Sequence, residues 1–306
     1  MDNLTHTLTG IALARLGLEK RWPGATLTLA LSSNLPDIDI VAGLWGRTAY
    51  LEHHRAITHA FPASLLQAAA LALLLSRWPG SKTTRRFGPT LFLAWLGVCL
   101  HIVWDLWTSY GTRALLPFDA TWYSWDWMFI VDPFFLALLV LACFGGRWFK
   151  RPHVPRWAGL FALAYIGLRA GVHWMALGQA QSFAGSEYEG VRALPTPLSL
   201  NRWRFLAKNG ETFVTGSVQA YGTSRTRVVF PRGAPDALVD RVAASSHAAQ
   251  VFLDFSAFPR LETQKDGETT VIVWRDLRFA AIRSDGFFCE VKVDASGRII
   301  SERIVF

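Results

Sequence analysis

Charged side chains are scarce in this chain. Asp, Glu, Lys and Arg together make up 18% of the 306 residues, whereas soluble globular domains carry about 25%. Hydrophobic residues make up 51%, the mean hydropathy is +0.23, and the apolar excess is concentrated in residues 1–180. This distribution excludes an ordinary soluble domain for the first part of the chain and predicts helices embedded in a membrane.

Several common signatures are also missing. The three cysteines, Cys99, Cys143 and Cys289, form no CxxC pair and no disulfide framework. The sequence has no glycine-rich phosphate loop and no GxSxG motif, so neither a P-loop nor a serine nucleophile is indicated. The N-terminal residues MDNLTHTLTG lack the basic start of a signal peptide, and we expect the first segment to be retained.

Six apolar segments run through the first part of the chain. The last four are credible membrane spans. The first two are too short to cross a bilayer core of ~30 Å and are expected to be half-buried, re-entrant or packed inside a bundle. Many of the 14 tryptophans flank these segments, as in an interfacial belt. We therefore predict a mainly α fold, with a bundle of four to six hydrophobic segments in residues 1–180. The segments are Leu4–Leu18, Ala25–Leu35, Phe61–Ser76, Gly88–Trp107, Trp127–Gly145 and Trp157–Leu177.

Residues 185–306 have a different pattern, which predicts an extramembrane α+β domain. Alternating β-branched and aromatic stretches are separated by Gly and Asp turns, as in short strands. Residues Pro235–Phe255 are expected to be helical. The expected strands are Arg202–Ala207, Glu211–Ala220, Arg225–Phe230, Thr269–Leu277, Phe287–Val293 and Arg298–Phe306.

The net charge of +8 is unevenly distributed between the loops. One set holds eleven basic residues and one acid, Glu19: Arg15, Lys20, Arg21, Arg77, Lys82, Arg85, Arg86, Arg147, Lys150, Arg151 and Arg156. The opposite set holds only three basic residues and eight acids. The positive-inside rule makes the first set cytoplasmic, so no nucleic-acid partner is needed to explain the charge. We expect a bacterial inner membrane protein with its acidic end and C-terminal domain on the extracytoplasmic side.

Histidines and aspartates gather at that acidic end. His101 and Asp105 are spaced i,i+4 and share one helix face, where two side chains can bind one ion. The alternative is a simple hydrogen bond inside the bundle, but an ionisable pair in an apolar helix is costly and favours a function. Asp37 and Asp39 lie on a turn, where they can bind metal, act as a general base or cap a helix.

The stretch HHRAITH places His53, His54 and His59 within seven residues. Three imidazoles at one membrane face favour metal ligation, with the choice among them open. Arg55 or Arg113 is a candidate for binding a phosphate, since a guanidinium can bind two phosphate oxygens at once. The alternative role of Arg55 is contact with lipid headgroups or pairing with Glu52.

Other histidines carry weaker indications. His6 opens the first apolar segment, with neighbours typical of ordinary capping. His153 lies in a basic loop and His247 in the C-terminal domain, so we exclude both, and His173 stays unassigned.

Taken together, these motifs resemble the YdjM-type family of membrane-bound metal-dependent hydrolases. The resemblance rests on NLTHTLTG with His6, LPDID at 35–39, HHRAITHA at 53–60, HIVWD at 101–105 and TSYGTRALLPF at 108–118, and it covers residues 1–180. That family is distantly similar to the zinc-dependent phospholipase C and P1 nuclease group, all-helical phosphoesterases with a His/Asp metal cluster. The HxxxD pair of that group matches His101 and Asp105. A later HxxxE pair has no counterpart here, which implies one or two ions rather than three.

Our hypothesis is an integral membrane hydrolase that uses a divalent metal, zinc being expected, on a phosphoester of a lipid or envelope molecule. The expected metal ligands are His6, His54, His59, His101 and Asp105, and the expected catalytic residues are Asp37, Asp39 and Arg55. Membrane lipids are expected partners. The alternatives are a metal-binding scaffold, a transporter, or an envelope interaction module built on the C-terminal domain.

Overall fold

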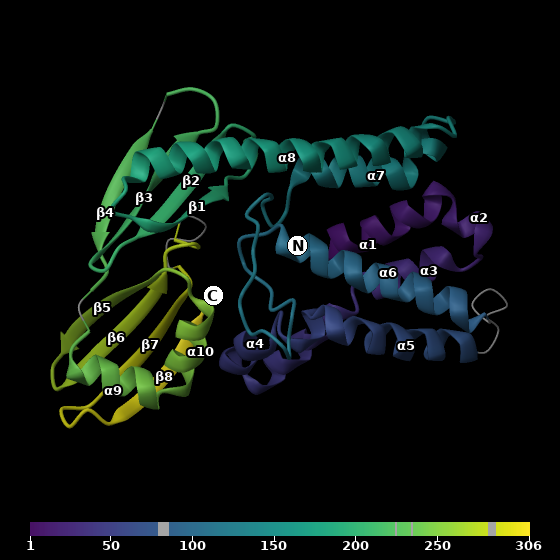
Figure 1. Ribbon diagram of the computed structural model, residues 1–306. Coiled ribbons are helices and arrows are strands. Elements are labelled where there is room, and N and C mark those ends of the chain that lie inside the picture. Colours follow the sequence, from purple (N-terminus) through teal and green to yellow (C-terminus); the bar gives the residue numbers. More distant parts are fainter. Residues whose placement is uncertain (79–85, 224, 234, 281–285) are drawn as a thin grey trace. The chain divides into compact units, whose positions relative to one another are not determined.

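The computed structural model describes residues 1–78, 86–223, 225–233, 235–280 and 286–306 and divides the chain into two compact units (Figure 1). The first unit holds residues 1–39, 55–173 and 195–200, and the second holds residues 40–54, 174–194 and 201–306. Lys82 and Arg85 of the expected basic loop lie outside the described residues. The domain limits of 1–180 and 185–306 stay predictions.

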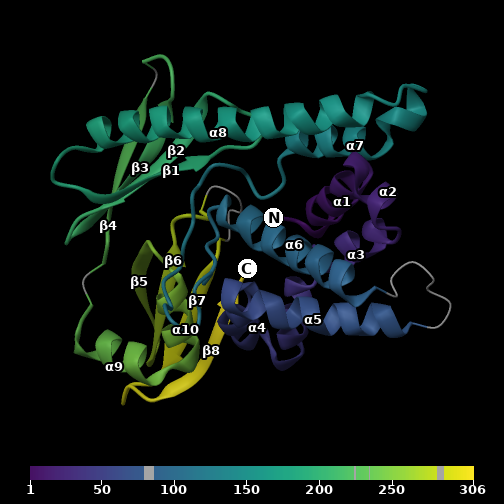
Figure 2. The same cartoon turned by 45° about the vertical axis from the view of Figure 1, so that its right-hand side comes forward.

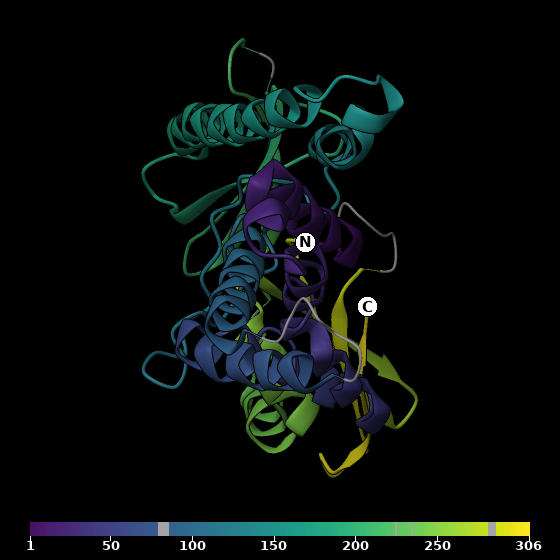
Figure 3. The ribbon, with the colours of Figure 1, turned by 90° about the vertical axis from the view of Figure 1, so that its right-hand side faces the viewer.

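Helices build the first unit. Helix α1 packs against α3 and α7, and α6 packs against α3 and α5; Figure 3 views these helices closer to their ends. The helices are α1 (Asn3–Leu13), a π-helical turn (Ala14–Leu18), α2 (Glu19–Arg21), α3 (Ala25–Ser32), a 3-10 segment (Pro36–Trp45), a 3-10 turn (Ile57–His59), α5 (Phe61–Arg77), α6 (Phe87–Leu106), α7 (Pro133–Trp148) and α8 (Val154–Ala184). The 3-10 segment and α8 each continue into the second unit.

Among the described residues, fewer helices are long and apolar enough to cross a full bilayer than the four to six apolar segments expected from the sequence. Helices α6 and α8 are long and apolar enough to cross a membrane. The segment Arg47–His59 and helix α5 meet at a bend of 82°, and the number of such spans is three if this bent pair counts as one. Helix α7 has 16 residues and begins later than expected. Asp132 accepts hydrogen bonds from the N–H groups of Phe134 and Phe135, and Pro133 occupies the first turn, so residues 127–132 stay outside the helix.

Two glycines let the central helices approach one another closely. A Cβ on Gly97 of α6 would lie 1.9 Å from Ser32 Oγ, and a Cβ on Gly10 of α1 would lie 2.5 Å from the Leu29 carbonyl oxygen. Gly97 is one helical turn before His101, so the contact also brings the end of α3 next to that imidazole. Close packing in the bundle thus fixes the position of a candidate ligand.

Two four-stranded antiparallel sheets form most of the second unit, in the orders β1-β2-β3-β4 and β5-β6-β7-β8 (Figure 2). A shared core of Leu194, Leu206, Phe213, Phe258 and Leu277 joins them. Helix α10 packs on β7 and β8, and α4 packs on α10 and β8. The bounds are α4 (Arg47–His53), β1 (Glu189–Pro195), β2 (Arg202–Lys208), β3 (Thr212–Gln219), β4 (Thr226–Pro231), α9 (Ala237–Ser245), α10 (His247–Phe255), β5 (Pro259–Asp266), β6 (Thr269–Asp276), β7 (Phe288–Val293) and β8 (Ile299–Val305).

The six expected strands are confirmed with small changes at their ends, and the expected helical stretch is confirmed as α9 and α10. Strands β1 and β5 were not expected. Strand β1 contains one glycine and one proline among its seven residues. Strand β5, with the sequence PRLETQKD, is largely exposed and charged. Neither has the apolar alternation that marks a strand in a sequence.

Replacing Gly97 with alanine should destabilise the protein by about 1–3 kcal/mol, because the added methyl group overpacks the contact with Ser32. The matched control is Gly167→Ala in α8, where nothing lies within 4 Å of the new Cβ. Thermal unfolding of the purified proteins in detergent measures the difference. Equal unfolding midpoints for Gly97→Ala and the parent would contradict the close-packing account.

Candidate metal centre

Four donor atoms from three separate stretches of the first unit converge at one point. They are Asp37 Oδ1, His59 Nε2, His101 Nε2 and Asp105 Oδ2, and all lie within 4.8 Å of one another. The two Nε2 atoms are 3.0 Å apart. His59 Nε2 lies 3.4 Å from Asp37 Oδ1 and 3.3 Å from Asp105 Oδ2, and His101 Nε2 lies 3.6 and 3.4 Å from the same two oxygens. The grouping combines two imidazoles and two carboxylates, a donor set suited to zinc.

These spacings fit a tetrahedral ion. Zinc binds nitrogen and oxygen at about 2.0–2.2 Å, so adjacent ligand atoms of a regular tetrahedron are about 3.3–3.6 Å apart. Four of the five distances given above lie in that range, and the fifth, between the two imidazole nitrogens, is shorter. The donor atoms are therefore spaced much as the ligands of a single ion would be.

The outer nitrogens of both imidazoles already have hydrogen-bond partners. His101 Nδ1 lies 2.7 Å from the Ser33 carbonyl oxygen, to which it can only donate. His59 Nδ1 lies 3.1 Å from Asp39 Oδ2 and donates to that carboxylate in the neutral tautomer that carries its proton on Nδ1. Both Nε2 lone pairs then face each other across 3.0 Å. A cation between them removes the repulsion, and a carboxylate or carbonyl behind each imidazole is the usual outer partner of a metal-bound histidine.

The two oxygens of Asp105 have different surroundings. Oδ1 accepts a hydrogen bond from Arg55 Nη2 at 2.9 Å, contacts the Met1 amine and lies 3.4 Å from His6 Nε2. Oδ2 faces the other three donors, and in the described part of the chain it has no hydrogen-bond partner although it is fully buried. Because burying an unpaired carboxylate oxygen is costly, a metal ion fits this position.

Side-chain charges around the four donors do not balance. Asp37, Asp39 and Asp105 supply three negative charges, and the basic groups beside them are the Arg55 guanidinium and the Met1 amine that contacts Asp105. Burial tends to raise the pKa of Asp37, but the hydrogen bond with His59 and the charge of His101 outweigh this effect and lower the pKa below its usual value. A divalent cation would compensate the excess of carboxylates, as a buried site requires.

The structure separates the two carboxylates of the LPDID turn. Asp37 belongs to the four-donor group. Asp39 instead accepts hydrogen bonds from the Arg55 N–H and the Thr58 hydroxyl, both at 3.0 Å, and lies behind His59. Asp37 is therefore the candidate ligand or base, whereas Asp39 orients an imidazole.

Arg55 adopts an uncommon backbone conformation, with a φ of 59°. Its carbonyl oxygen accepts from the Arg113 N–H, and its guanidinium donates to Asp105 and to Thr108 Oγ1. The guanidinium also lies 4.8 Å from the Tyr110 ring centroid. Arg55 is 3% exposed and holds Asp105 in place; a role in phosphate binding stays a prediction.

The other histidines considered in the sequence analysis lie outside the four-donor group. His6 stacks on His101 with ring centroids 3.8 Å apart but is not part of the four-donor group. His54 belongs to the second unit, where it stacks on Tyr50. Ligand roles for His6 and His54 stay predictions. His247, which we excluded, is exposed and lies 3.3 Å from Glu52.

Sequence reasoning missed the partners that orient the ligands. They are the Ser33 carbonyl, Thr58 and Thr108. A backbone carbonyl leaves no signature in a sequence. The two hydroxyls do stand next to recognised motifs, in AITHA and WTSYG, and that proximity was the available signal.

Apolar helices of membrane-spanning length and a buried His/Asp cluster that can bind a metal define the class of this protein. The sequence model of the YdjM inner membrane protein family matches residues 1–177, and the chain belongs to that family. It is also similar to the uncharacterized protein YfhP of Bacillus subtilis strain 168, with 26% identity over 319 residues that cover 99% of this chain and 93% of that protein. No solved structure matches the chain.

Substitutions at Asp37 and Asp39 should separate a ligand from an orienting residue. Asp37→Ala removes a donor atom and should abolish stoichiometric metal binding. Asp39→Asn weakens the partner of His59 and should lower metal affinity about 10–100-fold without abolishing it. Metal content by mass spectrometry and competition with a chelator give both values, with exposed His153→Ala as the control. Full metal binding by Asp37→Ala would exclude Asp37 as a ligand.

Proposed function

We propose that this protein is an integral membrane hydrolase that uses a divalent metal, zinc in our proposal, to cleave a phosphoester of a lipid or envelope molecule. The observation that carries the proposal is the convergence of four donor atoms on one point, where Asp105 Oδ2 is buried without a hydrogen bond from any described residue. A donor set made only of imidazole and carboxylate is common to zinc hydrolases.

His59, His101 and Asp105 would hold the ion, and Asp37 would be either a fourth ligand or a general base beside a coordinated water. A zinc ion bound there would lower the pKa of a coordinated water from ~15.7 toward ~7 and so supply hydroxide at neutral pH. Asp37 has a side chain that is 15% exposed, whereas those of His59, His101 and Asp105 are at most 1% exposed. Water and substrate therefore reach the group past Asp37, whose carboxylate is in position to accept a proton as general base.

Two features favour an amphiphilic substrate. The chain belongs to a family of inner membrane proteins. Ile38, which directly follows Asp37, is 58% exposed, although a soluble protein would usually bury such a side chain. A lipid phosphoester would present its phosphate to the donors and its acyl chains to the bilayer. The extracytoplasmic orientation of this end, predicted from the loop charges, is part of the proposal.

Transport is the less favoured alternative. It would need polar groups through the bundle, and Arg169 in α8 is the main candidate. Its Nε donates to the Trp127 carbonyl at 3.0 Å and its Nη1 to the Ser199 carbonyl at 2.9 Å. These backbone contacts favour a role in anchoring neighbouring segments of the first unit.

Zinc-loaded protein should release product from a panel of lipid phosphoesters and chromogenic phosphodiesters, and His101→Ala and Asp105→Ala should lose at least about 10²-fold in rate. Treatment with a chelator should abolish the activity, and added metal should restore it. The control is His247→Ala, which changes an exposed histidine of the second unit. Stoichiometric metal binding without hydrolysis across the panel would replace the enzyme with a metal-binding scaffold.

Arg55→Lys should distinguish two roles of the arginine. Lysine keeps the charge but cannot make the paired contacts with Asp105 and Thr108. If Arg55 only positions Asp105, kcat and metal affinity should fall while KM changes little. If Arg55 also binds the phosphate, KM should rise about tenfold or more. Steady-state kinetics together with metal titration decide between the two.

A further inference from the structure

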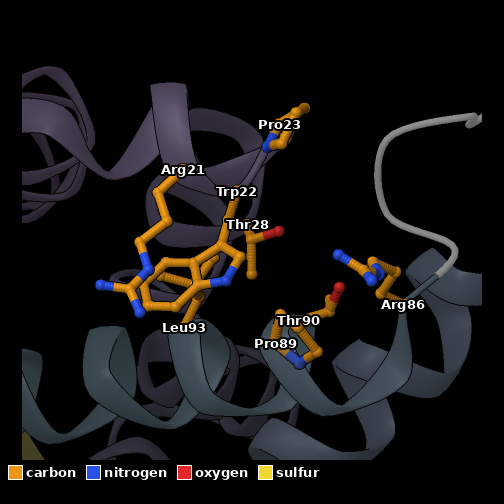
Figure 4. A pocket seen from close by; sticks show the side chains of 9 residues that line it. Arg21, Trp22, Pro23, Thr28, Arg86, Pro89, Thr90 and Leu93 are labelled. Atoms are coloured by element: carbon orange, nitrogen blue, oxygen red, sulfur yellow. The ribbon is translucent and has the colours of Figure 1, made fainter.

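A hollow lies in the first unit, near the start of α6. It is small, with a cavity volume of about 30 Å³, is partly open to solvent, and lies between the turn from α2 to α3 and the first turns of α6 (Figure 4). The residues that carry its chemistry are Arg21, Trp22, Thr28, Arg86, Thr90 and Leu93. Thr90 precedes His101 by eleven positions, or about 16 Å along the helix. The hollow is therefore separate from the metal centre.

Local contacts fix the shape of the hollow. Gly24, with a φ of 91°, ends the turn that leads into α3. The Glu19 carboxylate accepts hydrogen bonds from the Gly24 and Thr26 N–H groups, at 2.9 and 2.6 Å. Burial tends to raise the pKa of Glu19, but these hydrogen bonds lower it below its usual value. The Glu19 carboxylate thus bonds to the backbone of its own turn.

Positive charge and hydroxyl groups dominate the polar lining. In Figure 4 the polar ends of Thr28, Thr90 and Arg86 face one another across the hollow. The Arg21 guanidinium lies over the Trp22 indole, 4.8 Å from the ring centroid. In the described residues neither Arg21 nor Arg86 forms an ion pair with an acid. Two arginines without counterions and two hydroxyls make a site for an anion such as a phosphate.

The surface beside the hollow is apolar. On α3, Leu27 and Leu31 are 51% and 44% exposed, and on α6, Phe92 and Trp95 are 47% and 42% exposed. The Phe92 and Trp22 rings lie 6.0 Å apart, so this apolar surface reaches the edge of the hollow. In a membrane protein such a surface is covered by acyl chains. A ligand with an anionic head and apolar tails matches both parts.

We propose that this hollow binds the phosphate headgroup of an anionic phospholipid. Arg86 and the hydroxyls of Thr28 and Thr90 would contact the phosphate, and Arg21, stacked on Trp22, would add a second positive charge at the rim. The acyl chains would run along the exposed apolar side chains of α3 and α6. The site is independent of hydrolysis at the metal centre and would hold a resident lipid.

Native mass spectrometry of the full chain in detergent tests the proposal. The protein is mixed with equal amounts of phosphatidylglycerol and phosphatidylcholine of matched chain length. We expect the parent to retain phosphatidylglycerol preferentially, and Arg21→Gln and Arg86→Gln each to lower that preference about fivefold, as expected for one basic residue at an anionic lipid surface. The double variant should show no preference.

Matched controls are Arg77→Gln and Arg147→Gln, which remove exposed arginines at the ends of α5 and α7, outside the hollow. They should keep the preference. The thermal unfolding midpoint and metal content of every variant should equal those of the parent, so that loss of lipid is not loss of fold. Equal retention of the two lipids by the parent, or an unchanged preference in the double variant, would overturn the proposal.

A titration with inorganic phosphate separates a lipid site from a site for a soluble anion. Phosphatidylglycerol should raise the unfolding midpoint of the parent, and phosphate at millimolar concentration should not prevent this shift. A rise with inorganic phosphate alone, without one from the lipid, would mean that the hollow binds a soluble anion and would also overturn the proposal.

Discussion

The first unit is organised around one electrostatic constraint, the burial of carboxylates and imidazole lone pairs at a single point. Three carboxylates outnumber the two basic groups beside them, Arg55 and the Met1 amine, at a site where only the Asp37 side chain is appreciably exposed. Residues around the donor atoms fix the orientation of these side chains. Ser33 and Asp39 fix the two imidazole rings, and Arg55 holds one oxygen of Asp105 so that the other faces the donors. The left-handed backbone of Arg55 is the conformational cost of that placement.

Parts of this centre could be predicted from sequence because they depend on local geometry. The i,i+4 spacing of His101 and Asp105 fixes a shared helix face whatever the rest of the chain does. The positions of the other candidates at one end of the apolar segments indicated that chain-distant residues would converge. The distinct roles of Asp37 and Asp39 were not predictable. They stand two residues apart on a 3-10 segment, and only tertiary contacts decide which one faces the donors.

In the fold, too, some elements could be predicted from the sequence and others could not. Strands with alternating apolar residues were predictable, whereas β1 and β5 have few such residues and depend on their neighbours in the sheet. The expected span over Trp127–Gly145 failed at its start because hydropathy does not register a helix cap. Asp132 and Pro133 set the first turn of α7, and the remaining helix has 16 residues. Apolar composition therefore predicted the membrane class better than the number of crossings.

The metal centre and the proposed lipid site lie at opposite ends of helix α6, and the dipole of this helix favours opposite charges at its two ends. The aligned peptide dipoles give a helix a partial positive charge at its N-terminus and a partial negative charge at its C-terminus. Arg86 and Thr90 stand at the N-terminal end, where an anion is favoured, and His101 and Asp105 stand in the last two turns, where a cation is favoured. Arg55 donates to the Asp105 carbonyl as well as to its carboxylate, so a cationic side chain already lies at that end. A single apolar helix can thus favour an anion at one membrane face and a metal ion toward the other without a charged residue in between.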